Sequence, residues 1–197
     1  MTNTRRIMIL GDSHAKGFLP HTRVDSDAIA ERAGTPEELR MAVSGSTAEE
    51  WALNSGGRME RAVLAAASCD AALISLGGND LFKIARDGNI EDAEIARTTC
   101  FLYDVISMIA LAVPRTFVLL YGYPFSKPDA QKMMAVARLD AFISAISGAA
   151  GEIRRARVET LDERLVLLPQ DWPGDDIHPF RSGYERIGDE LLRRLSS

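Results

Sequence analysis

The sequence predicts an α/β fold in which a parallel sheet of roughly five strands carries helices on both faces. Short apolar runs alternate along the chain with longer segments of helical periodicity. Parallel strands need crossover connections, and the intervening helices supply them. A chain of 197 residues, 46% of them hydrophobic, suits one core, and no repeat or linker interrupts it. We therefore expect a single domain over residues 1–197.

The strands are predicted from apolar runs that end abruptly at turn residues. Ile7 to Leu10 is apolar throughout and lies between Arg6 and Gly11, which is typical of a buried parallel strand. The other expected strands are 39–43, 71–76, 117–121 and 164–168. The run 39–43 alternates only weakly, and Pro169 closes the last one.

Capping residues and proline predict where the helices begin and end. Thr47 with Glu50, and Ser182 with Glu185, have the spacing of a capping box. Pro114 ends a long helix over 90–113. The other helices are expected over 25–33, over 58–67 and from residue 126.

Charge and composition argue against several classes of partner. The net charge is −5, and the 23 basic residues are scattered, so we expect no nucleic-acid partner. The uninterrupted apolar runs are too short to span a bilayer, and no signal peptide is recognisable, so we expect a cytoplasmic protein without a membrane partner. Cys69 and Cys100 are predicted to be buried free thiols. The sequence does not indicate an oligomeric state.

Four polar turns follow strands or precede the final helix, at 11–13, 44–47, 77–80 and 175–178. The carboxyl ends of parallel strands share one edge, where open α/β sheets bind ligands. Acyl transfer needs a nucleophile, a base, a group that orients the base, and oxyanion donors. Ser13 offers the hydroxyl, His178 the imidazole, and Asp175, three residues before it, a carboxylate to orient the ring. Asp176 is the competing orienter.

The remaining turns offer hydrogen-bond donors for an oxyanion. Gly45 can present a bare backbone amide, and Asn79 a side-chain amide. With the Ser13 amide they would form an oxyanion hole of three donors. Asp12 is expected to bond nearby loop amides and to have no chemical role.

These four blocks resemble those of the SGNH hydrolases, the GDSL-type esterases and lipases. The blocks are Gly11-Asp12-Ser13, Gly45, Gly77-Gly78-Asn79-Asp80, and Asp175 to His178. The resemblance implies a flavodoxin-like three-layer α/β/α sandwich and ester hydrolysis through an acyl-enzyme, with no metal and no cofactor. One position departs from the family pattern: His14 stands where an aliphatic residue is common. We expect His14 to be exposed, the alternatives being contact with substrate or with Asp12.

Six aromatic residues follow the same edge of the predicted sheet and are candidates to line a substrate pocket. Phe82 and Trp172 are the first candidates. The full set is Trp51, Phe82, Tyr123, Phe125, Trp172 and Phe180.

The sequence therefore predicts a serine esterase for short, acetyl-like acyl groups on a small molecule or a carbohydrate. A second hypothesis is a metal-dependent phosphoesterase that uses Asp12 and His14, extended by Asn79 and His178. Two-metal sites need many ligands, and the chain has only three histidines. A third hypothesis is a binding domain that kept the fold without catalysis, against which the complete serine, acid and histidine set argues.

Overall fold

The computed structural model describes residues 5–15, 18–19, 24–25, 27–80, 83, 92–121, 130–154, 156–172 and 178–197. Within these residues the main sheet has four strands in the order β1-β4-β5-β6, and every pairing is parallel. The strands are β1 (Ile7–Gly11), β4 (Ala71–Ser75), β5 (Arg115–Leu120) and β6 (Arg157–Asp162). Both β1 and β4 are buried along their whole length, which explains why their sequences are apolar on both faces.

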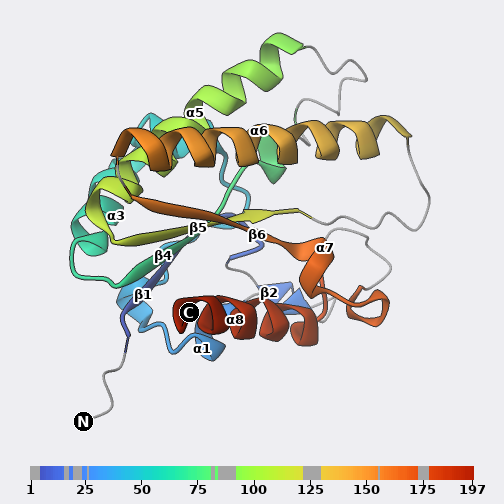
Figure 1. Cartoon of the computed structure of the whole chain (residues 1–197). Helices are drawn as coiled ribbons and strands as arrows, with labels where there is room; N and C mark the ends of the chain where they lie inside the picture. Colours follow the sequence, from blue (N-terminus) through green and yellow to red (C-terminus); the bar gives the residue numbers. More distant parts are fainter. Residues whose placement is uncertain are drawn as a thin grey trace.

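Helices cover both faces of this sheet, so the predicted three-layer sandwich is confirmed (Figure 1). One face carries α3 (Arg58–Ala66), α5 (Asp92–Ala112) and α6 (Ala130–Arg154). The other carries α1 (Asp27–Arg32) and α8 (Arg181–Leu195), which pack on each other. The short elements are α2 (Ala48–Ala52), α7 (Glu163–Val166), the antiparallel pair β2 (Phe18–Leu19) and β3 (Val24–Asp25), and 3₁₀ turns at Glu37–Leu39, Ser55–Gly57 and Pro169–Asp171.

The predicted strand at 39–43 is reduced to a single bridge. Arg40 pairs with Ile9 in the parallel sense, and the backbone N–H groups of Met41 and Val43 donate to the carbonyls of Ile9 and Gly11 at 2.8 Å each. This segment therefore runs along the free edge of β1 without forming a regular strand. The expected fifth strand is thus replaced by an irregular edge segment, and the turn that follows it still ends beside the end of β1.

The prediction of a last strand over 164–168 was wrong, because the strand β6 occupies 157–162 and residues 163–166 form the helix α7. In the part of the sheet that the structure describes, β6 is an edge strand that pairs with β5 and is only partly buried, which fits the charged residues that alternate with apolar ones along it. The strand was predicted instead over the apolar run that follows β6, although Leu165 in that run is 80% exposed. Asp162 caps α7 by accepting a hydrogen bond from the backbone N–H of Arg164.

The predicted capping box is confirmed at the start of α2, but the one predicted at the start of α8 is not formed. Thr47 and Glu50 form the predicted capping box at the start of α2. Ser182 does not cap α8; its hydroxyl donates to Asp171, and the helix follows Phe180 without a side-chain cap. The start expected at residue 126 lies outside the described residues. Of the two free cysteines, Cys69 is buried as expected, but Cys100 is exposed.

Among the described helices, α5 has the length and apolar composition that a membrane span would need. In the fold it packs against β5 and against α2, α3 and α6.

Asp140 joins three elements near the carboxyl end of β5. From α6 its buried carboxylate accepts a hydrogen bond from the backbone N–H of Tyr121 at 3.2 Å and pairs with Arg164 of α7 at 3.0 Å. Burial raises the pKa of Asp140 to about 7, against the lowering effect of Arg164 and of the Tyr121 N–H.

We predict that Asp140 makes the fold less stable as the pH rises. Its folded-state pKa lies above its unfolded-state value, so the folded protein binds more protons between about pH 4 and about pH 7, and stability falls across that window. Asp140→Asn keeps the acceptor for Tyr121 and does not titrate. Urea unfolding of both proteins should show wild type losing stability relative to the variant as the pH rises. A constant difference across the window would contradict the prediction.

We also predict that Gly11 cannot be replaced without loss of stability. Its φ is +141°, and an added Cβ would lie 2.0 Å from the Ser75 carbonyl oxygen. Gly34 is the matched control, because its φ is +66° but no atom lies within 4 Å of its added Cβ. In denaturant titrations Gly11→Ala should lose about 3 kcal/mol or more, and Gly34→Ala about 1 kcal/mol. Equal losses would show that the approach of β1 to β4 is not the constraint.

Candidate active site

The structure brings Ser13 and His178 together from opposite ends of the chain. Ser13 Oγ lies 2.9 Å from His178 Nε2, across 165 positions of sequence, and both residues are partly buried. Ser13 follows β1 by two residues, and His178 precedes α8 by three. A hydroxyl at hydrogen-bond distance from an imidazole nitrogen is the arrangement in which the imidazole can accept the hydroxyl proton.

Ser13 stands at the point of the sheet where ligands are expected. From β1 the chain moves to one side, to the edge segment 40–43, and then returns to the other side as β4. Such a reversal leaves a crevice outside the carboxyl ends of the two strands. The turn at 12–15 is closed by a hydrogen bond from the Ala15 N–H to the Asp12 carbonyl at 3.1 Å.

Asp12 fastens this turn to the sheet through three donors. The hydroxyls of Ser75 and Tyr121 and the backbone N–H of His14 each donate to its carboxylate at 3.0 Å. Asp12 is 1% exposed, and burial raises its pKa, while the positive charge that His14 carries when its ring is protonated and the three hydrogen bonds lower it. The expected bonding to loop amides is thus only part of the set, because two hydroxyls from β4 and the end of β5 complete it.

The two predicted oxyanion turns lie beside the end of β1. Gly45 is exposed, with a φ of +79°. Ser46 donates to the Gly11 carbonyl at 2.9 Å and accepts from Trp51 Nε1 at 3.0 Å. The Asn79 side-chain amide donates to the Ser46 carbonyl at 3.0 Å. The residues predicted as donors therefore share one edge with Ser13, and their role toward an oxyanion stays a prediction.

A buried aspartate that sequence reasoning missed holds the segment that carries His178. The carboxylate of Asp171 accepts from the Leu168 N–H at 2.8 Å and from the Ser182 hydroxyl at 2.9 Å, and pairs with Arg186 at 3.1 Å. Its carbonyl accepts from the Phe180 N–H at 2.6 Å. Asp171 therefore ties together both ends of the segment 172–180.

Several predicted residues lie outside the described residues, among them Asp175, Asp176 and Phe82. Trp172 is partly buried and directly follows Asp171, in the segment that carries His178. Trp51 is fully buried, and its indole N–H is bonded to Ser46, so it packs in the core and does not line a pocket.

The expectation that His14 is exposed was wrong. The residue is 2% exposed, and its Nδ1 lies 3.3 Å from Oε1 of Glu163, which is fully buried. Its ring stacks on that of His178, with centroids 5.0 Å apart and planes at 27°. Glu163 is the first residue of α7 and directly precedes the run 164–168 where the sequence suggested a strand, so no local signal linked it to His14.

The same contacts involve Asp12 and His14, the two residues that the metal-dependent phosphoesterase hypothesis uses. The Asp12 carboxylate is occupied by three donors, and the His14 ring faces Glu163 and His178. Over the described ranges of the chain, no three His, Cys, Asp or Glu side chains are grouped as metal ligands.

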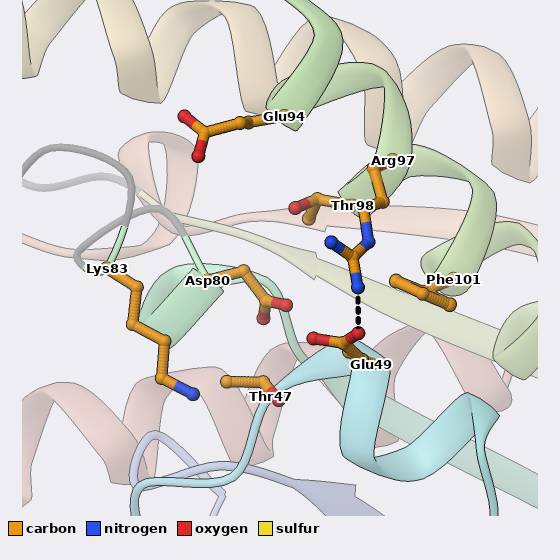
Figure 2. Close-up of a pocket in the computed structure, with 8 residues that line it drawn as sticks. All are labelled: Thr47, Glu49, Asp80, Lys83, Glu94, Arg97, Thr98 and Phe101. Atoms are coloured by element: carbon orange, nitrogen blue, oxygen red, sulfur yellow. Dashed lines mark hydrogen bonds and ion pairs between the residues drawn. The ribbon is translucent and has the colours of Figure 1, made fainter. Parts of the chain in front are cut away.

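A pocket of about 130 Å³ is lined by Asp80, which follows Asn79 in the sequence, and by residues of α2 and α5. Figure 2 shows Arg97 of α5 in an ion pair with Glu49 of α2. The guanidinium of Arg97 lies 5.5 Å from the centre of the Phe101 ring. Asp80 accepts from the Ala48 N–H at 2.9 Å, and burial raises its pKa. The lining residues are Thr47, Glu49, Asp80, Lys83, Glu94, Arg97, Thr98 and Phe101. Acidic side chains, basic side chains and one aromatic ring therefore line the pocket.

Comparison with known proteins agrees with these observations. The sequence pattern of the GDSL-like lipase/acylhydrolase family matches residues 9–186. A search of curated proteins found no match. Among solved structures, the acetylxylan esterase Axe2 from Geobacillus stearothermophilus superposes with a TM-score of 0.66 at 15% identity, over 98% of this chain and 94% of that one. A family 3 carbohydrate esterase from Clostridium thermocellum gives a TM-score of 0.61 at 20% identity, over 98% and 99%.

Proposed function

The chain belongs to the GDSL-like lipase/acylhydrolase family, and on that premise we propose that it is a serine esterase that forms an acyl-enzyme on Ser13. The observation that carries the proposal is the 2.9 Å separation of Ser13 Oγ and His178 Nε2. Two of the Axe2 structures, described as catalytic mutants, have a serine or a histidine replaced by alanine. A serine and a histidine therefore matter for catalysis in a protein of the same fold.

In the proposed reaction His178 acts first as a base and then as an acid. Its Nε2 takes the Ser13 proton as Oγ bonds to the ester carbonyl carbon. The tetrahedral intermediate collapses, the C–O bond to the alcohol breaks, and His178 gives its proton to the leaving oxygen. Water, activated in turn by His178, then attacks the acyl-enzyme and releases the acid. We assign Asp175 to orient the imidazole, because it lies three residues before His178 in the same segment.

Three N–H groups are proposed to bind the oxyanion. They are the backbone amides of Ser13 and Gly45 and the side-chain amide of Asn79. An asparagine amide has two N–H bonds. The hydrogen bond to the Ser46 carbonyl holds the Asn79 side chain in place, so its second N–H can point toward the substrate. Removal of one such donor typically lowers turnover ~10²–10³-fold.

We propose that the substrate is a short acyl ester, such as acetyl, carried by a carbohydrate or another polar small molecule. The pocket lined by Asp80 supports this assignment, because its charged residues suit a hydroxyl-rich leaving group better than a long acyl chain. The names of the two structural neighbours, an acetylxylan esterase and a carbohydrate esterase, agree with that class.

We predict that Ser13→Ala abolishes ester hydrolysis, by ~10⁴-fold or more in kcat, because no other group replaces the nucleophile. Wild type should hydrolyse para-nitrophenyl acetate and acetylated xylo-oligosaccharides, with kcat/KM falling as the acyl chain lengthens. The matched control is Ser144→Ala, which removes an exposed hydroxyl from α6 and should leave the kinetics unchanged.

Two results would contradict the proposal. Phosphatase activity that survives Ser13→Ala and disappears with a chelator would favour the metal-dependent phosphoesterase. A folded wild type that hydrolyses none of these esters would favour a binding domain. A preference for octanoyl over acetyl esters would contradict the substrate class alone.

A further inference from the structure

We propose that His14 and Glu163 form a buried imidazole–carboxylate pair that positions His178 and stabilises its protonated form. The inference rests on the proposed function, in which His178 carries the proton between steps. His14 and Glu163 are positioning residues in this account, since both act through the ring of His178.

The contacts place the pair directly behind the proposed base. The rings of His14 and His178 are stacked, with centroids 5.0 Å apart and planes at 27°. On its other side His14 Nδ1 meets Glu163 Oε1 at 3.3 Å. The side chains of His14 and Glu163 are 3% and 0% exposed, so the pair is shielded from water. His178 thus has Ser13 at its Nε2 and a fixed ring against its face.

Two tyrosines restrict the movement of this pair. The ring of Tyr121, from the end of β5, meets His14 edge-on with centroids 5.0 Å apart, and Tyr184 of α8 does so at 6.1 Å. Both tyrosines are fully buried. Because His14 directly follows Ser13, the turn that places the nucleophile also places the surface against which His178 rests. A shift of His14 would therefore disturb both partners of the 2.9 Å hydrogen bond.

The effect of the His14–Glu163 pair on the protonated form of His178 depends on the net charge of the pair. With His14 neutral and Glu163 ionised, the pair carries one negative charge, which favours the imidazolium that forms when His178 takes the Ser13 proton. The proposal requires this state, because a protonated His14 would place a like charge against His178. Other charged groups also act here: Asp12 on the turn itself, and Asp140 and Arg164 on the side of Glu163. Among the described residues, the tyrosine hydroxyls of Tyr121 and Tyr184 are further titratable groups near the ring, and Asp175, which we assign to orient His178, is an acid in the same segment as His178.

The test is the pH dependence of catalysis in Glu163→Gln, which keeps the shape and an oxygen acceptor but removes the charge. Loss of that charge should lower the pKa of His178, so the acid limb of kcat/KM should move to lower pH by about 0.5–1 unit. The maximal kcat should fall about tenfold, because His178 becomes the weaker base. Glu190→Gln, at the opposite end of α8 and paired with Arg193 and Arg194, is the control and should leave the limb in place.

A second variant covers the case in which Glu163→Gln does not fold. His14→Phe combined with Glu163→Leu replaces both partners by apolar groups, so neither is left buried alone, and a ring still faces His178. It should show the same shift of the acid limb. An unchanged limb in either folded variant, with lower stability only, would overturn the proposal and leave the pair a packing feature.

A third measurement separates this inference from the proposed function. Proton NMR titration of the His178 ring in Ser13→Ala, with and without Glu163→Gln, needs no turnover. The pKa of His178 should be lower when Glu163 is replaced. An equal pKa in the two proteins would refute the inference even if the esterase activity is real, and a lower pKa would support it even if the substrate is not an ester.

Discussion

The buried carboxylate of Asp12 is the constraint on which the rest of the site depends. Three donors from β4, from the end of β5 and from the turn itself converge on it. Removing any one of them would leave a buried acceptor poorly satisfied, which typically costs 1–3 kcal/mol. The close approach of Gly11 to Ser75 sets the start of the same turn. Ser13 is therefore held by the middle of the sheet, and its position does not rely on a surface loop.

The second half of the site reaches Ser13 by different means. His178 and the two residues after it are neither helix nor strand, and the buried Asp171 contacts Leu168 on one side of His178 and Phe180 and Ser182 on the other. The ring of His14 also stacks on the ring of His178. Ser13 thus closely follows a regular strand, whereas the backbone at His178 is neither helix nor strand. Buried polar contacts hold His178 in place instead. Such contacts are demanding, because each buried charge needs its partner in place.

The sequence could predict the features that depend on residues close together in the chain, and it missed those that depend on residues far apart. The runs in β1, β4 and β5 are apolar on both faces, so the strands were found. The turns after β1, after the edge segment 39–43 and after β4 gave Ser13, Gly45 and Asn79 as candidates by short-range chemistry. The edge strand β6 is half polar and was missed. Glu163 lies 149 positions from His14, and neither residue carries a local sign of the other. Long-range polar pairs of this kind become visible only when the fold brings them together.

The central claim is that Ser13 is a nucleophile because His178 stands beside it. The most direct measurement is mass-spectrometric mapping of a fluorophosphonate label on wild type, His178→Ala and the exposed-site control Ser144→Ala. We expect one label on Ser13 in wild type and in the control, and at least ~10²-fold slower labelling in His178→Ala, because the base that activates the hydroxyl is gone. A label on another residue, or labelling of Ser13 at the same rate without His178, would contradict the account.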